Sequence, residues 1–416
     1  MGWSLPVALA RLLPGAVKQE ASESNQEDHV RIAIDARMIR QGSMHGIARY
    51  VFQLLRGLRS RSTVHQFFVF INRGSPLESY DWPEPITLVT AHSQWISIGE
   101  QRELPELLSS LRIDLFHAPS FVAPIFVPCA MVMTIHDLNH MVLPQFYTLF
   151  HQMYYHIVVR RSIKRSRYIL TVSKFSKKEI VRTLGLDPSK IFVTYNGVSE
   201  DYRPITDRVY LEYVRDLYGL PERFILCVSN NKPHKNVHQL VRAYCYSNTD
   251  IPLVLACPTD ANLIKIAENY GKKHLIFFSK FIEEAHLPAV YSLTDLFVYP
   301  STYEGFGLPP LEALACGTPV VVARSSSLPE VVGDNAIFAN PFDYKAIAEA
   351  LEQGVYDTAT RESLRKKGLA HARRFSWDQM IEKTIKVYEL CGCPELRADA
   401  EQGRLGEPVS VGEERS

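Results

Sequence analysis

The chain has 416 residues, a hydrophobic fraction of 46% and a formal net charge of +1. A chain of this length exceeds one ordinary hydrophobic core, so we expect two domains. The small net charge argues against a protein that binds nucleic acid through a general excess of positive charge. The seven cysteines lack the spacing of a zinc site, and several lie in apolar runs. This usage indicates a reducing compartment, and we expect a cytoplasmic protein.

Both ends of the chain are expected to be disordered. Residues 1–29 contain a short apolar stretch, "WSLPVALARLLPGAV", and then a polar one, "KQEASESNQEDH". The apolar stretch has no basic segment before it, so it makes a poor signal peptide, and no run of about 20 apolar residues is present that could span a bilayer. Residues 393–416 are charged and contain no aromatic side chain, which is typical of a disordered tail.

Two series of short apolar runs lie between these ends. The first includes "RIAIDAR", "QFFVFINR" and "AMVMTIHD", and amphipathic helical stretches separate most of its members. The second includes "RFILCVS", "PLVLAC" and "LFVYPS", and it begins after the turn-rich segment "NGVSEDYRPITD". Alternating strands and helices predict parallel sheets. We therefore predict an α/β protein with two doubly wound, Rossmann-like domains, over 30–198 and 199–375, that face a central cleft.

The segment "PSTYEGFGLPPLEALACGTPVV" follows one of these predicted strands. Gly305 and Gly307 permit close approach of the backbone to a ligand. A helix opening near Leu308 would aim free N–H groups and its positive end at an anion, which indicates a diphosphate site. Glu312 would lie in that helix, where it could accept hydrogen bonds from ribose hydroxyls, and Glu304 would lie nearer the cleft. Without the surrounding glycines and prolines, the two glutamates would more simply be a surface carboxylate and a helix-dipole partner.

The segment resembles the donor-site motif of retaining GT-B glycosyltransferases of family 4, the glycosyl transferases group 1 type. The two glutamates stand in its E-x7-E arrangement, and the resemblance extends over residues 31–390. Further matching segments are "GIARYVFQLL", "TIHDLNH", "TVSKFSKKEI", "YNGVSEDYRP" and "SNNKPHKNVHQLVRAY". The segment "FSWDQMIEKTIKVYEL" resembles the helix, expected over 376–392, that returns to the N-terminal acceptor domain in this family.

The resemblance implies a role for each matching residue. Lys235 would neutralise the diphosphate, Glu304 would contact the donor sugar, and His136 would touch the sugar or its phosphate, so these three would form the catalytic group. Glu312 would bind the ribose. The positions implied to bind the donor are Gly46, Asn230, Lys235, Phe281, Ile282, Glu304, Gly305, Phe306, Gly307, Leu308 and Glu312. From the residues alone, His136 could instead be a histidine of the hydrophobic core whose ring nitrogens are hydrogen-bonded within the protein.

The implied activity is transfer of a hexose, with mannose favoured, from a GDP- or UDP-linked sugar to an acceptor hydroxyl with retention. The setting would be polysaccharide or glycolipid assembly. No cofactor and no metal are expected, since no D-x-D triplet occurs and Lys235 with backbone N–H groups would stabilise the leaving diphosphate. We find no well-placed carboxylate nucleophile in the N-terminal domain that argues for double displacement, so a front-face mechanism is favoured.

One departure from the family keeps other functions open. Most members carry an arginine where this chain has Asn230, so a catalytically inactive nucleotide-sugar-binding protein is an alternative. A nucleotide-sugar epimerase with two Rossmann-like domains is a second alternative, against which the E-x7-E segment argues. A phosphorylase is a third, against which the missing environment for a cofactor lysine argues.

Residues 146–168 are aromatic first and basic afterwards. Such a segment could lie on an anionic membrane surface or hold a lipid-linked acceptor, which would make the protein peripheral at the inner membrane face. The simpler alternative is a helix buried on one side. Its solvated side chains would then be Arg160, Arg161, Lys164, Arg165 and Arg167.

Overall fold

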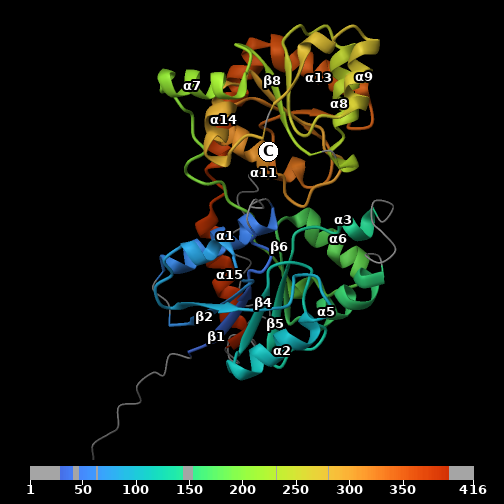
Figure 1. The fold of residues 1–416 in the computed structure, drawn as a ribbon. Coiled ribbons are helices and arrows are strands. Elements are labelled where there is room, and N and C mark those ends of the chain that lie inside the picture. The colour runs from blue at the N-terminus through green and yellow to red at the C-terminus, as the bar shows by residue number, and fades with distance from the viewer. Residues whose placement is uncertain are drawn as a thin grey trace, which may run out of the picture.

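The computed structural model describes residues 29–40, 46–61, 64–143, 153–230, 232–279 and 281–392. The predicted leader (apart from its last residue), the predicted tail and positions 146–152 of the aromatic and basic segment lie outside the described residues. The described chain forms two α/β domains, which Figure 1 shows one above the other with the N-terminal domain below.

The N-terminal domain is built on a parallel sheet with the order β3-β2-β1-β4-β5-β6-β7. Its strands are β1 (Arg31–Asp35), β2 (Gln66–Ile71), β3 (Ile86–Thr90), β4 (Leu115–Ala118), β5 (Ala130–Ile135), β6 (Tyr168–Thr171) and β7 (Ile191–Val193). Its longer helices are α1 (Ile47–Arg59), α2 (Glu100–Ser110) and α6 (Lys174–Leu184). Shorter turns are η1 (Pro76–Ser79), α3 (Asn139–Val142), the π-helical turn η3 (Tyr155–Val159), α5 (Arg160–Arg165) and η4 (Pro188–Lys190).

The C-terminal domain has a second parallel sheet, with the order β10-β9-β8-β11-β12-β13. Its strands are β8 (Ile225–Val228), β9 (Leu253–Ala256), β10 (Ile276–Phe278), β11 (Leu296–Tyr299), β12 (Val320–Ala323) and β13 (Ile337–Ala339). Its helices are α7 (Arg208–Tyr218), α8 (Val237–Tyr246), α9 (Ala261–Asn269), α10 (Leu287–Leu293), α11 (Leu308–Ala315), α12 (Leu328–Val332), α13 (Tyr344–Tyr356) and α14 (Thr358–Ala372). Short turns are η5 (Pro233–Lys235), η6 (Lys273–Leu275) and η7 (Glu284–His286).

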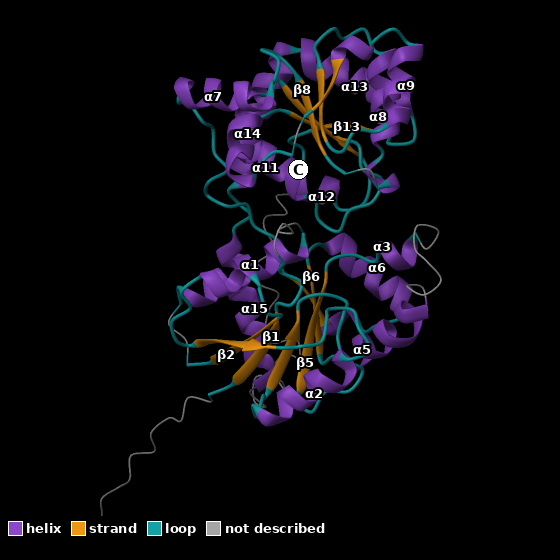
Figure 2. Cartoon of the chain, in the orientation of Figure 1, coloured by secondary structure: helices purple, strands orange, loops and turns teal. Residues whose placement is uncertain are grey.

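Helices cover both faces of each sheet (Figure 2). Each domain accordingly has two clusters of buried hydrophobic side chains, one on either side of its sheet. In both sheets the strand order runs outward in two directions from the first strand, so each sheet has a switch point beside that strand. The predicted fold of two doubly wound, Rossmann-like domains is confirmed, and ligands in such sheets bind at the carboxyl ends of the strands near the switch point.

The last described helix, α15 (Trp377–Gly392), lies in the N-terminal domain although it ends the described chain (Figure 1). Met380, Ile381 and Tyr388 belong to the same buried cluster as α1 and β1. A Cβ atom added to Gly57 of α1 would lie 2.0 Å from the Ile381 side chain, so a larger residue there would require that side chain to move. The chain therefore crosses twice between the domains.

A buried polar contact fixes α15 to the sheet. Tyr388 has its hydroxyl 2.6 Å from Nδ1 of His117 on β4, and the other ring nitrogen lies 2.8 Å from Oγ1 of Thr134 on β5. Burial, with a smaller effect from His136, lowers the pKa of His117 to about 3. The imidazole is therefore neutral at physiological pH, and both of its nitrogens have a partner.

Tyr388→Phe is expected to lower the free energy of unfolding by about 1–3 kcal/mol, because a buried ring nitrogen of His117 loses its hydrogen-bond partner. Urea unfolding at neutral pH measures the loss. Tyr356→Phe is the matched control, since its hydroxyl meets Asp250 at the exposed surface. Equal, small losses in the two variants would contradict the structural role of the Tyr388 contact.

Candidate active site

The loops that follow β8 and β11 meet at the switch point of the C-terminal sheet. The first leads through η5 into α8, and the second contains Glu304 and leads into α11. Asn236, with a positive φ of 60°, donates from Nδ2 to the carbonyl of Pro300 in the second loop (3.2 Å) and to that of Pro341, which follows β13 (2.7 Å). The backbone N–H of Thr302 also donates to the His234 carbonyl at 2.8 Å. The two loops therefore form one rigid unit.

Lys235 and Glu304 form an ion pair in this unit. Lys235 Nζ lies 2.6 Å from Oε1 of Glu304 and 2.8 Å from the hydroxyl of Tyr299, which itself donates to Oε1 at 2.9 Å. Burial raises the pKa of Glu304, but Lys235 outweighs that effect and the net pKa lies below its ordinary value. Burial lowers the pKa of Lys235, but Tyr299 and Glu304 outweigh it and the net pKa is raised. Both side chains are therefore charged at neutral pH.

The glycines of the motif are required by close packing. Gly307 has a φ of 99° and caps α11, and an added Cβ atom there would lie 2.6 Å from Leu328. At Gly305 an added Cβ atom would lie 2.1 Å from the backbone oxygen of His136 in the other domain. Ser173 and Ser176, in and just before α6, donate to the Gly305 carbonyl at 2.7 and 3.1 Å. The motif thus forms a direct contact between the two domains.

His136 follows β5 and faces this contact. Its Nε2 lies 3.0 Å from the carbonyl oxygen of Pro119, and its ring packs edge-on against Tyr50 at 4.8 Å. Burial lowers the pKa of His136 to about 4. Because a carbonyl can only accept, we assign the proton to Nε2, which leaves Nδ1 as a hydrogen-bond acceptor. His136 is therefore a neutral acceptor beside the donor motif.

Glu312 is 3% exposed and binds two side chains. The hydroxyl of Tyr291 donates to Oε2 at 3.1 Å, and Arg49 of α1, in the opposite domain, donates to Oε1. Arg49 also pairs with Glu284 and donates to the hydroxyl of Tyr202 at 2.7 Å. Burial raises the pKa of Glu312, although Arg49 acts in the opposite direction. Because Glu312 is buried and Glu304 is ion-paired, neither is a simple surface carboxylate.

Arg49 is a site residue that the sequence reasoning did not find. It lies in the first turn of α1, where the helix dipole disfavours a positive charge and where no acidic residue compensates it. An uncompensated positive charge in the first turn of a predicted helix is the feature of the sequence that could have identified Arg49. The partner residues that explain it are far away in the sequence, Glu312 by 263 positions and Tyr202 by 153.

The other predicted donor-site residues lie around this centre in different environments. Gly46 caps α1 with a φ of 57°, Asn230 is exposed and accepts from the backbone of Lys232, and Phe281 is 73% exposed beside buried Ile282. Leu308 packs against the cores of both domains. Phe306 is buried against Tyr195 and Phe375, so its side chain packs in the interior and only its backbone could meet a donor.

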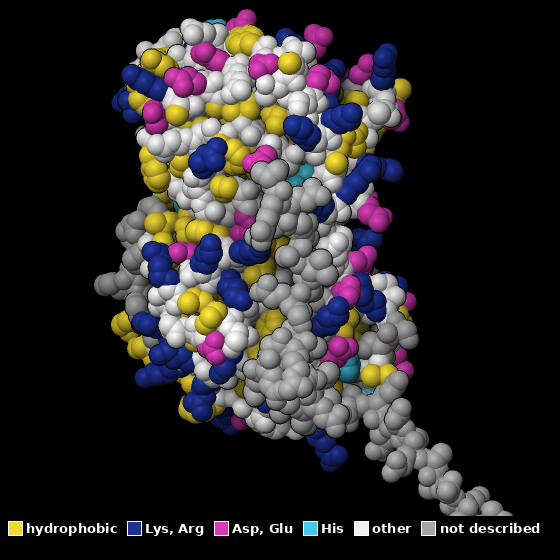
Figure 3. Space-filling model, turned by 180° about the vertical axis from the view of Figure 1, so that it is seen from behind, with side chains coloured by type: hydrophobic (Ala, Val, Ile, Leu, Met, Phe, Trp, Pro, Cys, Tyr) yellow, Lys and Arg dark blue, Asp and Glu magenta, His cyan; other side chains and the backbone are white. Residues whose placement is uncertain are grey.

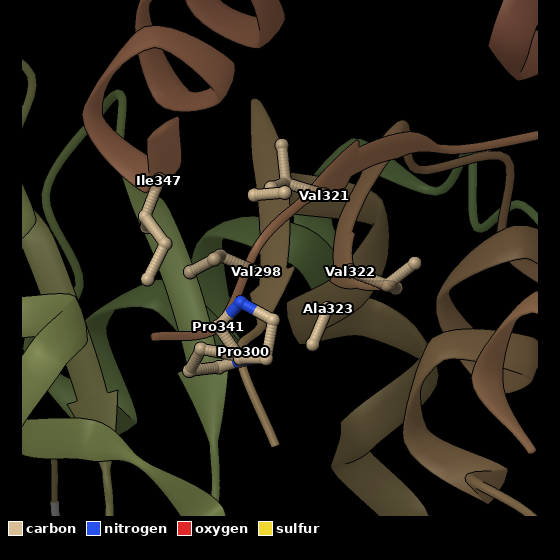
Figure 4. A pocket seen from close by; sticks show the side chains of 8 residues that line it. Val298, Pro300, Val321, Val322, Ala323, Pro341 and Ile347 are labelled. Carbon is tan, nitrogen blue, oxygen red and sulfur yellow. The ribbon is translucent and has the colours of Figure 1, made fainter. Parts of the chain in front are cut away.

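A small apolar pocket lies behind the motif, between β11, β12 and α13 (Figure 4). Val298, Pro300, Val322, Pro341 and Ile347 are among the side chains that line it. It offers no charged group, so it does not suit a diphosphate. Among the described residues, no group of three or more His, Cys, Asp or Glu side chains is arranged to hold a metal ion.

Solved structures share this two-domain architecture. Sucrose-phosphate synthase from Thermosynechococcus elongatus aligns with a TM-score of 0.71 and 18% identity, covering 89% of this chain and 100% of that one. HepE from Anabaena, solved in complex with UDP-glucose, aligns with a TM-score of 0.68 and 19% identity, covering 86% and 100%. The fold is therefore GT-B, the two-domain fold of many glycosyltransferases.

Sequence comparison identifies the family. Residues 44–202 match the model of Glycosyltransferase Family 4, and residues 218–371 match that of Glycosyl transferases group 1. O-antigen chain mannosyltransferase B of Escherichia coli is 33% identical over 283 residues, which cover 66% of this chain and 74% of that protein. The chain belongs to the group 1 glycosyltransferases, as the resemblance implied.

Gly305→Ala is expected to separate the two domains at this contact, because its Cβ atom would overlap backbone rather than a movable side chain. The variant should show a larger radius of gyration in small-angle X-ray scattering and a loss of turnover, with each domain still folded by circular dichroism. Gly99→Ala serves as the control, since Gly99 also has a negative φ, of −58°, but an added Cβ atom there would meet nothing closer than 3.4 Å. An unchanged radius and rate for Gly305→Ala would contradict this account.

Proposed function

We propose that the protein transfers a mannosyl residue from a nucleotide diphosphate mannose, GDP-linked ahead of UDP-linked, to a hydroxyl of a saccharide acceptor. The observation that carries the proposal is the Lys235–Glu304 pair at the switch point, with Glu312 in the adjoining helix and His136 opposite. The mannosyl assignment and the setting, polysaccharide or glycolipid assembly, rest on similarity to the Escherichia coli O-antigen chain mannosyltransferase.

The donor site would work by exchange of partners. In the structure Lys235 neutralises Glu304. A diphosphate that binds beside α11 would replace Glu304 as the partner of the Lys235 ammonium group, because phosphate oxygens form strong charge-assisted hydrogen bonds. Pro309 and Pro310 carry no N–H, so the N–H of Leu308 is the donor that opens the helix toward the phosphate. Glu304, released from Lys235, could then accept hydrogen bonds from the sugar hydroxyls.

The proposed transfer retains configuration and uses no metal. The bond between the anomeric carbon and the phosphate oxygen breaks, and the bond electrons remain on the diphosphate, where Lys235 stabilises the charge. The acceptor hydroxyl attacks from the same face and gives its proton to the departing phosphate oxygen. His136, with Nδ1 as an acceptor, would orient a donor-sugar hydroxyl rather than donate a proton. The proposal includes a second cationic contact to the diphosphate, from Lys232, because Asn230 stands where most members of the family carry an arginine.

Substitutions of the two glutamates should change different kinetic parameters, KM for Glu312 and kcat for Glu304. Glu312→Gln should raise KM for the donor and leave kcat near the wild-type value, because ribose binding is present both before and during transfer. Glu304→Gln should lower kcat with little change in nucleotide affinity, because the sugar changes geometry and charge as its bond breaks. Initial rates at varied donor concentration, with calorimetric titration of GDP and UDP, measure both effects. The reverse pattern would reverse the roles, and no effect of either change would refute the proposed site.

We also propose that the enzyme is peripheral on an anionic membrane surface, where a lipid-linked acceptor would lie. Met153 and Ile157 are exposed, and so are the basic side chains of Arg161, Lys164 and Arg165 beyond them. The Arg165 guanidinium lies 4.2 Å from the ring centroid of Phe126, which is itself exposed. On the face of the N-terminal domain that Figure 3 shows, basic and hydrophobic side chains are interspersed with acidic ones. None of the described helices is long and apolar enough to cross a membrane.

Arg161→Gln with Lys164→Gln should lower binding to anionic vesicles roughly 30-fold at low salt, since each basic residue near such a surface contributes about 1 kcal/mol. Sedimentation with phosphatidylglycerol vesicles measures it, and rising salt should weaken wild-type binding. Lys366→Gln with Lys367→Gln, an equal charge change at exposed positions of α14, is the control. Equal recovery of the wild type with neutral and anionic vesicles would remove the proposal.

A further inference from the structure

Glu312, the carboxylate proposed to bind ribose, is covered by other side chains in this structure. Only 4% of the Glu312 side chain is exposed, and its two oxygens already accept from Arg49 and Tyr291. Tyr291 belongs to the same domain as Glu312 and lies in the buried core. Arg49 comes from the opposite domain. A ribose can therefore reach Glu312 only if the Arg49 guanidinium moves.

Arg49 lies between the parts of the chain expected to hold a nucleoside. Besides Glu312 on α11, it contacts Glu284 in η7, which follows Phe281 and Ile282, two of the positions that the family resemblance implies bind the donor. Its guanidinium also lies 5.5 Å from the ring centroid of Tyr202, in the segment that crosses between the domains. Arg49 is 13% exposed, whereas Glu284 is 48% exposed. The Arg49 guanidinium thus fills the space beside Glu312. Its other carboxylate partner, Glu284, lies at the solvent-exposed rim of this contact.

The chemistry of the guanidinium matches that of a ribose edge. Vicinal hydroxyls would donate hydrogen bonds to Glu312, and a guanidinium presents N–H donors in a planar fork that a carboxylate accepts. The contact also neutralises a carboxylate that would otherwise be buried without a partner, which is costly. It offsets the unfavourable position of Arg49 in the first turn of α1.

We propose that Arg49 occupies the ribose subsite of the nucleotide-free enzyme and must leave Glu312 when the donor binds. The inference rests on the proposed role of Glu312 in binding ribose. After its displacement, Arg49 keeps its contact with exposed Glu284, so the two domains remain joined at the rim. When the nucleoside diphosphate leaves, Arg49 returns to Glu312. The exchange lowers the apparent affinity for nucleotide, because only the fraction of molecules with Arg49 displaced can bind it.

Arg49→Met should therefore tighten binding of GDP, or of UDP if the wild type binds that nucleotide instead, by about tenfold. Inorganic pyrophosphate has no ribose, so its affinity should not change. Glu284→Gln should leave nucleotide affinity within about twofold of the wild type, because the rim contact is present before and after displacement. Arg56→Met is the control, since Arg56 is exposed on the same helix. Calorimetric titration of the full-length variants, checked for folding by circular dichroism, gives each dissociation constant.

A second variant covers the case in which Arg49→Met does not fold. Arg49→Lys keeps the positive charge but replaces the planar fork with a single ammonium, so a smaller tightening of nucleotide binding is expected. Weaker or unchanged nucleotide binding in the folded Arg49 variants would overturn the proposal. So would an equal tightening by Glu284→Gln, since the rim contact would then be the obstacle. Glu312→Gln tests the ribose role of Glu312 separately from the displacement of Arg49. If Glu312→Gln leaves nucleotide affinity unchanged, the ribose role is refuted. If Glu312→Gln and Arg49→Met both weaken nucleotide binding, only the displacement of Arg49 is refuted.

Discussion

The contact between the Gly305 loop and the backbone of His136 is the constraint on which the rest of the site depends. Gly305 has no side chain, so the loop can approach the His136 carbonyl, and two serines hold it there. This contact brings the carboxyl edge of one sheet against that of the other. A side chain at position 305 would overlap the His136 backbone, so the residues that follow β5 and those that follow β11 could not approach this closely.

Charged groups near the contact between the two domains are paired with one another across short distances. Lys235 pairs with Glu304 within the C-terminal domain, and Arg49 pairs with Glu312 between the domains. These side chains are mostly removed from solvent, and an isolated charge there would be strongly unfavourable. Each pair therefore neutralises charges that would be unfavourable if they were buried alone.

The second crossing of the chain gives the N-terminal domain a helix from the C-terminal end. The hydroxyl of Tyr388 meets a neutral, buried His117, and Gly57 allows α15 to lie close to α1. Since α1 also carries Arg49, the same helix that binds α15 contacts Glu312 in the other domain. The position of α1 thus depends on contacts with both domains, which ties the geometry of the site to the packing of the chain end.

The sequence by itself determined the alternation of strands and helices, the two doubly wound domains and the local motif that contains Glu304, Gly305, Gly307 and Glu312. These features follow from hydrophobic periodicity and from short-range backbone requirements, which neighbouring residues express directly. Only the tertiary structure decided which groups of the two domains meet. Arg49 and Glu312 are 263 positions apart, and Phe306 is buried against Phe375, which lies in the segment between α14 and α15. Periodicity carries no information about such pairs, because their energy arises from desolvation and packing that exist only once the two domains are in contact.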